Sequence, residues 1–154
     1  MADARSIEEV LTGEPFTAGL APAHLALLAG CAKNVGLVPG YIHREGEPAD
    51  AFYLLRSGSV ALEVHGPAGG LVVETLRGGD ALGWSWLFPP HRWSFDVRVL
   101  EPTRAIAFDG ACLRGKCDLD HELGYQLMKR VARVFTARLA AARLQLLDLY
   151  GPRA

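Results

Sequence analysis

This sequence lacks the features that would tie it to a membrane or to nucleic acid. No apolar run approaches the roughly 18 residues that a membrane-spanning helix needs. Residues 1–6 have no apolar core of the kind found in signal peptides. The formal net charge is −1, which gives no general attraction to polyanions. We therefore expect a cytoplasmic protein that binds neither membrane nor nucleic acid.

Cysteine and histidine are too few and too scattered to predict a metal site. Cys31, Cys112 and Cys117 are the three cysteines, and no two of them form a CxxC pair. The five histidines include no His-x-His pair of the kind that metal-dependent cupin enzymes use. We expect reduced, partly buried thiols that pack as small apolar side chains. We also expect no metal and no cofactor.

Recognisable catalytic motifs are missing as well. The chain contains no P-loop, no nucleophile elbow and no dinucleotide fingerprint. We therefore expect a protein that is not an enzyme.

What the chain does have is enough apolar material for a core. Apolar residues make up 50% of the 154 residues and charged residues 21%, which is typical of a globular fold. We expect one domain over residues 1–154 with three parts. These are short helices in 1–33, many strands in 34–109 and helices in 111–150.

The strand region alternates turn signals with short apolar runs. The clearest runs are 51–55, 59–64 and 71–76, and the glycine-rich segment 66–70 between the last two predicts a hairpin tip. Many short strands at this spacing indicate a β-sandwich or barrel.

The flanking regions predict helices. Two short helices are expected over 6–11 and 23–31, and a third over 111–116. Asp118 and Asp120 then offer capping side chains for a helix over 121–150, which contains no proline and a single glycine.

This long helix has two apolar faces and a basic remainder. A heptad seam with spacings of three and four consists of Tyr125, Met128, Ala132, Phe135, Leu139, Ala142, Leu146 and Leu149. A second stripe consists of Leu123, Leu127, Val131 and Val134. We expect the stripe to pack on its own domain and the seam to pair with a second copy, giving a homodimer. The alternative is one helix packed along its own domain.

The same helix is basic. Five basic residues and no acidic residue lie between Gly124 and Leu147. Such a run is typical either of a solvent-exposed face or of a surface that binds an acidic partner.

All three tryptophans lie in the segment 78–99, at Trp84, Trp86 and Trp93. The segment begins with glycines and is interrupted by Pro89-Pro90. So much aromatic surface in one short stretch indicates either a binding pocket or a pocket that has been filled.

The motifs resemble those of the cyclic-nucleotide-binding domains of the catabolite activator and nitrogen-fixation regulator superfamily. The segment PGYIHREGEPADAFYLLRSGSVALEV, 39–64, is similar to the first half of that domain, and GGDALG, 78–83, matches the lead-in to its phosphate-binding cassette. The resemblance implies an α+β fold, in which short N-terminal helices, a β-roll of the jelly-roll type and a long C-terminal dimerisation helix follow one another. It also places a cassette at 78–99, where a helix N-terminus and an arginine hold the cyclic phosphate.

The cassette departs from the family at its two main ligand contacts. The family has a ribose-binding glutamate where this chain has Trp84, and its phosphate-binding arginine aligns with Trp93, which Ser94 follows. Losing two hydrogen bonds to charged groups costs roughly 3–6 kcal/mol. Cyclic nucleotide is therefore possible but disfavoured as the ligand.

Three states of the pocket remain open. Trp84, Trp86, Phe88 and Trp93 could fill the interior of the β-roll. The pocket could instead be reshaped for another ligand, or Arg92 could replace the missing arginine and give weak binding of a cyclic nucleotide. The candidate ligand-binding residues are Gly83, Trp84, Ser85, His91, Arg92, Trp93, Ser94 and Arg98.

We therefore expect a non-catalytic small-molecule sensor or regulatory module that acts through a protein partner. The alternative is a structural or adaptor protein with a vestigial pocket. The helix-turn-helix domain that gives the family its DNA binding has no counterpart after residue 150 of the sequence, so we expect no DNA binding.

Overall fold

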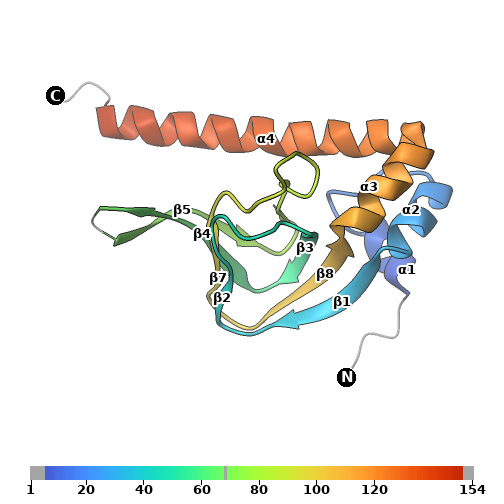
Figure 1. Cartoon of the computed structure of the whole chain (residues 1–154), viewed down its shortest axis with the longest axis horizontal. Helices are drawn as coiled ribbons and strands as arrows, with labels where there is room; N and C mark the ends of the chain where they lie inside the picture. The colour runs from blue at the N-terminus through green and yellow to red at the C-terminus, as the bar shows by residue number, and fades with distance from the viewer. Residues whose placement is uncertain (1–5, 68, 151–154) are drawn as a thin grey trace.

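A computed structural model describes residues 6–67 and 69–150. Two short helices come first, α1 (Ile7–Thr12) and α2 (Pro22–Ala29). The strands are β1 (Ala32–Leu37), β2 (Gly40–His43), β3 (Ala51–Ser57), β4 (Ser59–Gly66), β5 (Gly69–Arg77), β6 (Ala81–Leu82), β7 (Asp96–Val99) and β8 (Thr103–Asp109). The chain then forms α3 (Gly110–Leu119) and α4 (His121–Tyr150). Figure 1 shows α4 running above the strands, with the other three helices gathered at one end.

The strands form a β-roll of two antiparallel sheets. One sheet has the order β1-β8-β3-β6 and the other has the order β2-β7-β4-β5. The β4–β5 hairpin pairs residues 59–66 with 69–77, with an irregularity between Leu62 and Glu63. The predicted β-roll with N-terminal helices and a long C-terminal helix is confirmed.

Strand β3 is buried on both faces, which explains its uninterrupted apolar sequence. Phe52 and Leu54 pack with the helices, whereas Tyr53 and Leu55 face the interior of the roll. Successive side chains of a strand point to opposite faces. A strand covered on both sides therefore needs apolar residues at nearly every position.

The helices cover the outer face of the β1-β8-β3-β6 sheet. Leu11, Leu28 and Leu113, from three different helices, are at most 2% exposed and belong to one cluster. A disulfide joins Cys31, just before β1, to Cys112 in α3. The expectation of reduced thiols is therefore wrong for these two residues, because the fold brings their Cα atoms within 5.6 Å across 81 positions of sequence. Cys117 is free and half-buried.

Helix α4 has the two faces that its sequence predicts. Its first turn is capped by the Asp120 carboxylate, which accepts a hydrogen bond of 3.1 Å from the Leu123 amide. Leu123, Leu127 and Val131 are buried in the chain's own core. Seven of the eight seam residues are exposed, and Phe135 is the half-buried exception.

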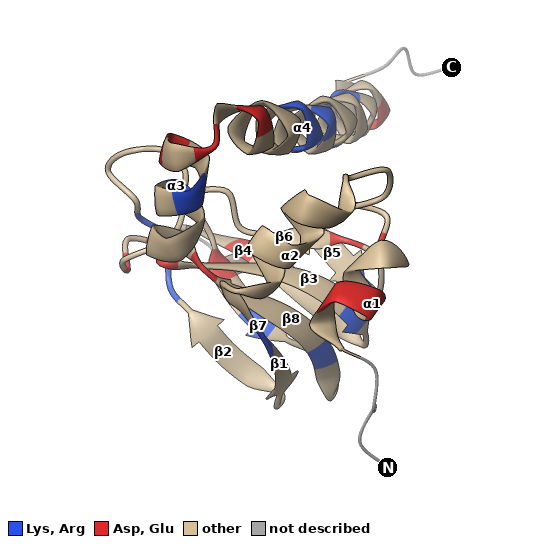
Figure 2. Ribbon diagram, turned by 90° about the vertical axis from the view of Figure 1, so that its right-hand side faces the viewer, with Lys and Arg blue, Asp and Glu red and all other residues tan. Residues whose placement is uncertain are grey.

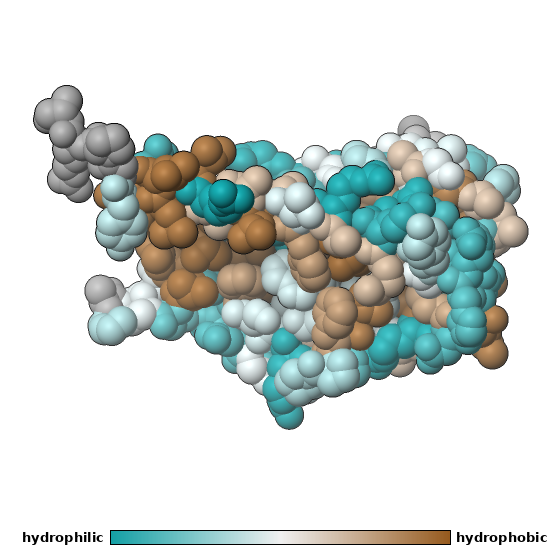
Figure 3. Space-filling model, turned by 90° about the horizontal axis from the view of Figure 1, so that it is seen from above, coloured by the Kyte–Doolittle hydropathy of each residue, from teal (hydrophilic) through white to brown (hydrophobic). Residues whose placement is uncertain are grey.

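The far half of α4 is exposed along its whole length from residue 139 to 150. Lysine and arginine mark the middle of the helix (Figure 2). Apolar side chains gather over its C-terminal half (Figure 3), and the exposed ones there include Leu144, Leu146, Leu147 and Leu149. In the part of the chain that the structure describes, no helix combines the length and the apolarity that crossing a bilayer requires.

Candidate functional site

The cassette segment, 78–99, contains β6, β7 and the loop that joins them. Gly83, the last glycine of its lead-in, has φ +94°, which a glycine adopts without strain. Residues 84–95 form a compact loop that includes a cis Pro89–Pro90 bond. The loop is joined back to the turn before β3 by main-chain bonds, one of them from the Gly46 amide to the Trp93 carbonyl at 2.8 Å.

Trp93 fills the pocket of the cassette. Its side chain is 4% exposed, lies among the core residues of the roll and stacks on His43 with ring centroids 4.3 Å apart. A Cβ placed on Gly83 would lie 2.9 Å from the Trp93 ring, so the indole touches the glycine backbone directly. The void left beside the ring has a volume of only about 10 Å³. That is about enough for a single water molecule and far too small for a nucleotide.

The other aromatic residues of the segment lie in different places. Trp84 is half-buried and meets Phe135 of α4 edge-on, with centroids 5.2 Å apart. Trp86 is 1% exposed but belongs to the core beneath the helices, not to the roll interior. Phe88 is 39% exposed. Of the four aromatic residues expected to fill the roll, only Trp93 is a buried member of its interior core.

The candidate ligand-binding residues separate into two groups. Five of them line the small void together: Gly83, Trp84, Ser85, Trp93 and Ser94. The exposed Arg92 donates a 2.8 Å hydrogen bond to the Gly46 carbonyl, and Arg98 of β7 donates one of 2.7 Å to Glu63 on the neighbouring strand β4. His91 is half-buried, and neither it nor either arginine lines the void.

Two ionisable groups near the cassette have shifted pKa values. Burial lowers the pKa of His43, which shares a 2.8 Å hydrogen bond with the Tyr53 hydroxyl. A neutral imidazole suits its position against Trp93, because a charged ring would lose its hydration there. Glu63 has a lowered pKa, chiefly because the Tyr41 hydroxyl donates a 2.6 Å hydrogen bond to its carboxylate.

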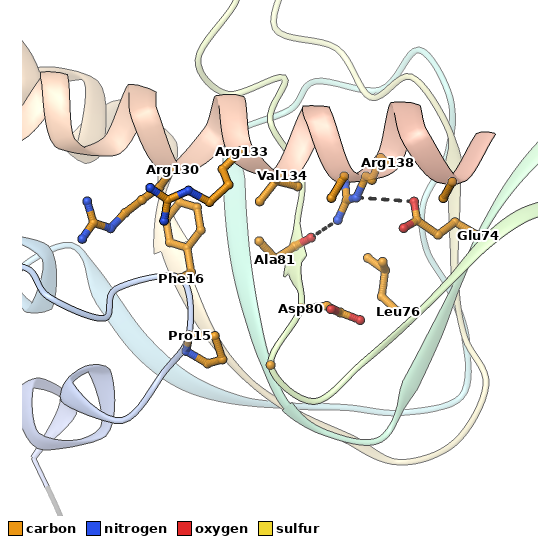
Figure 4. A pocket seen from close by; sticks show the side chains of 13 residues that line it. Pro15, Phe16, Glu74, Leu76, Asp80, Ala81, Arg130, Arg133, Val134 and Arg138 are labelled. Carbon is orange, nitrogen blue, oxygen red and sulfur yellow. Dashed lines mark hydrogen bonds and ion pairs between the residues drawn. The ribbon is translucent and has the colours of Figure 1, made fainter. Parts of the chain in front are cut away.

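A second and much larger cavity lies between α4 and the roll. Its volume is about 330 Å³, and Figure 4 shows the side chains that line it. The loop after α1, the β5–β6 region and the middle of α4 supply its walls. The lining residues are Pro15, Phe16, Glu74, Leu76, Gly79, Asp80, Ala81, Arg130, Arg133, Val134, Ala137, Arg138 and Ala141.

Arg138 is the main charged group of this cavity. Its Nε lies 3.4 Å from the Glu74 carboxylate, and its Nη2 donates to the Ala81 carbonyl (Figure 4). Its guanidinium also lies over the Trp84 ring, 5.1 Å from the centroid. Burial lowers the pKa of Arg138, while the nearby Glu74 and Asp80 act in the opposite direction.

Sequence reasoning missed this cavity. Phe16, Glu74 and Arg138 are far apart in the chain, and no motif connects them. The one available signal was the run of basic residues on α4, to which Arg130, Arg133 and Arg138 belong. Among residues 6–67 and 69–150, no group of three potential ligands is placed to hold a metal ion.

Comparisons with known proteins point to one family. The profile of the cyclic nucleotide-binding domain family matches residues 40–120. A CRP-like cAMP-activated global transcriptional regulator of Mycobacterium tuberculosis is 28% identical over 94% of this chain and 72% of that protein.

Solved structures give the same result. A Geobacter metallireducens protein classed as cyclic nucleotide-binding is 29% identical and superposes with a TM-score of 0.78, over 88% of this chain and 98% of that one. The catabolite activator protein of Thermus thermophilus is 25% identical with a TM-score of 0.68, over 88% of this chain and 63% of that one.

Proposed function

The chain belongs to the cyclic nucleotide-binding domain family, and from that premise we propose that it is a regulatory sensor domain whose cassette takes no cyclic nucleotide. In this proposal the domain is non-catalytic. It transmits its state through α4, by pairing with a second copy of the chain and by contact with a protein partner.

The observation that carries the proposal is the position of Trp93. The family's phosphate-binding arginine aligns with this residue, and its indole occupies the pocket, leaving about 10 Å³. A cyclic nucleotide would have to displace a buried tryptophan ring and would find neither of its usual charged partners. Burial of an aromatic side chain of this size stabilises a core by about 3–5 kcal/mol, so the displacement is costly.

The exposed seam of α4 supports pairing between copies. Leu139, Leu146 and Leu149 are 54–63% exposed on one stripe of a single helix. Apolar residues repeated at heptad spacing are typical of helix-on-helix pairing. The adjoining Leu144 and Leu147 widen the exposed apolar surface and offer a place for a protein partner (Figure 3).

An adaptor protein with a vestigial pocket is the second candidate, and the filled cassette favours it equally. The cavity beneath α4 favours a sensor instead. It is a space of about 330 Å³ with a partly buried arginine in its lining, which offers a sensor a place for a ligand. The sensor is therefore the function that the geometry supports best.

Calorimetric titration with cyclic AMP and cyclic GMP tests the closed cassette. We expect no saturable heat up to millimolar nucleotide for the unaltered chain. The double variant Trp84→Glu/Trp93→Arg restores both family contacts and should bind about 10²–10⁴-fold more tightly than the unaltered chain.

The single variant Trp93→Ala is the matched control, because it opens the same space without supplying a charge. It should bind cyclic nucleotide much more weakly than the double variant. Saturable binding of cyclic AMP to the unaltered chain at micromolar concentration would contradict the proposal. So would equal binding by the control and the double variant.

A further inference from the structure

We propose that the cavity beneath α4 is a binding site for a small carboxylic acid with an apolar body and a single negative charge. The cavity is distinct from the small void beside Trp93, since no residue lines both, although Gly79, Asp80 and Ala81 at the start of the cassette segment line the cavity. The regulatory effect of ligand binding rests on the proposed sensor function, whereas binding itself can be tested without it.

The apolar walls of the cavity determine the body of the ligand. Phe16, from the loop after α1, and Leu76, from β5, are 9% and 1% exposed. Both line the cavity, while Val134 and Ala137 line it from α4. The volume of about 330 Å³ lies within the usual range of about 300–1,000 Å³ for small-molecule sites. A hydrocarbon chain or a single aromatic ring would therefore be covered on both sides.

Arg138 provides the polar end of the site. Its side chain is 15% exposed, and its Nη1 is buried without a hydrogen-bond partner within the described residues. Its other nitrogens are already held by Glu74 and Ala81 (Figure 4). A buried donor without a partner costs free energy. Nη1 is out of reach of solvent, so the guanidinium must turn toward the cavity before a carboxylate oxygen can bond to it, and that bond would remove the existing penalty.

Two further arginines line the same wall. Arg130 is held in place, because it donates to the Ala18 carbonyl at 2.7 Å and to the Gln126 side chain at 2.9 Å. Arg133 is exposed at the rim and makes no ion pair within the part of the chain that the structure describes. Arg133 is therefore available to meet an anion as it enters.

The charge balance of the lining selects a monoanion. Arg130, Arg133 and Arg138 contribute three positive charges, and Glu74 and Asp80 contribute two negative ones. One negative charge on the ligand would neutralise the site. The two carboxylates would repel the second negative charge of a phosphate ester, and the arginines would repel a protonated amine.

Arg138 also connects the cavity to the rest of the domain. It contacts β6 through the Ala81 carbonyl and Trp84 through its guanidinium face. A carboxylate that draws Arg138 toward the cavity would weaken both contacts and alter how α4 rests on the roll. Ligand binding would thereby bias one arrangement of α4 over another.

Titration of the full chain with octanoate tests the site, with octanamide and octyl phosphate as probes of the same chain length. We expect octanoate to bind saturably and both other probes to bind at least about tenfold more weakly. Arg138→Gln should weaken octanoate binding about 10- to 100-fold. Arg143→Gln is the matched control, because Arg143 is exposed on the same helix and does not line the cavity.

A cavity-filling variant distinguishes a loss of the binding site from misfolding caused by the Arg138 substitution. Ala137→Phe places a ring in the cavity and should abolish octanoate binding, with helix content by circular dichroism unchanged. Equal affinity for octanoate and octanamide would overturn the assignment. So would equal affinity of the Arg138 and Arg143 variants, unimpaired binding by the Ala137 variant, or no binding of octanoate. If octanoate binds as expected and α4 pairing does not change, the site stands and the proposed sensor function fails.

Discussion

At the scale of single residues, Trp93 is the side chain that fills the interior of the cassette. Its ring lies against Gly83 and stacks on His43, so a position that the family uses for charge here belongs to the core. Neighbouring Arg92 is exposed and donates a hydrogen bond to the Gly46 carbonyl.

Glu63 is a second residue with a measurable consequence. Its side chain is 4% exposed and accepts hydrogen bonds from Tyr41 and Arg98. The Tyr41 hydrogen bond is the largest cause of the lowered pKa of Glu63. The unfolded chain therefore takes up this proton at higher pH than the folded chain does. The stability that Glu63 contributes is complete above its ordinary pKa of about 4.3 and is lost as pH falls through the lowered pKa.

We predict that Glu63→Gln lowers the free energy of unfolding at pH 7 and makes stability less dependent on pH below about 4.3. Urea unfolding between pH 3 and pH 7 measures both effects. Glu9→Gln removes an exposed carboxylate from α1 and should leave the pH dependence nearly unchanged. The same acid-induced loss of stability in the unaltered chain and in the Glu63 variant would show that the hydrogen bond to Tyr41 has no such role.

At the scale of secondary structure, the helices are held to the sheet by one buried cluster and one covalent bond. Leu123, Leu127 and Val131 attach the first half of α4 to the core. The Cys31–Cys112 disulfide attaches α3, which immediately precedes α4, to the chain just before β1. The position of α4 over the roll therefore depends on α3 as well as on its own contacts.

We predict that Cys112→Ser lowers the free energy of unfolding by about 2–4 kcal/mol, because the disulfide closes a long loop of the unfolded chain. Denaturant unfolding with and without a thiol reductant measures the loss. Reductant should lower the stability of the unaltered chain to that of the variant and leave the variant unchanged. Cys117→Ser serves as the control and should retain the response to reductant. Insensitivity of the unaltered chain to reductant would contradict a stabilising disulfide.

At the scale of the whole molecule, α4 contributes to two surfaces. One face of the helix closes the cavity against the roll, and the seam faces outward. Phe135 belongs to the predicted seam, but it packs on Trp84 and Phe88 of its own chain, with centroids 5.2 and 6.2 Å away. It therefore links the seam to the cassette and is a poor probe of pairing alone.

We predict that Leu139→Glu/Leu146→Glu converts a dimer into a monomer in sedimentation velocity, because charge on the seam opposes apolar pairing. The control Ala140→Glu/Leu147→Glu adds the same charge one position away from the seam, on exposed residues, and should remain dimeric. A monomeric unaltered chain would refute the pairing itself. Dimers of both variants would refute the choice of seam.

Some of this structure could be predicted because its cause is local. The bounds of α4 follow from the cap at Asp120 and the absence of proline, and they agree with the prediction over 121–150. Strands β3, β4 and β5 follow from apolar runs between glycine turns and extend only one to two residues beyond the predicted ends. The burial of Leu123, Leu127 and Val131 and the exposure of most of the seam on α4 also follow from helical spacing.

Other features depend on which distant residues meet, and no local pattern carries that information. The sequence by itself determined the β-roll, the long two-faced helix and the placement of all three tryptophans in the cassette segment, since spacing and residue type suffice for each. Only the tertiary structure decided that Trp93 closes the cassette while Trp86 lies in another core. It also decided that Cys31 meets Cys112, and that Phe16, Leu76 and Arg138 enclose a cavity, because packing in three dimensions sets which side chains share a space.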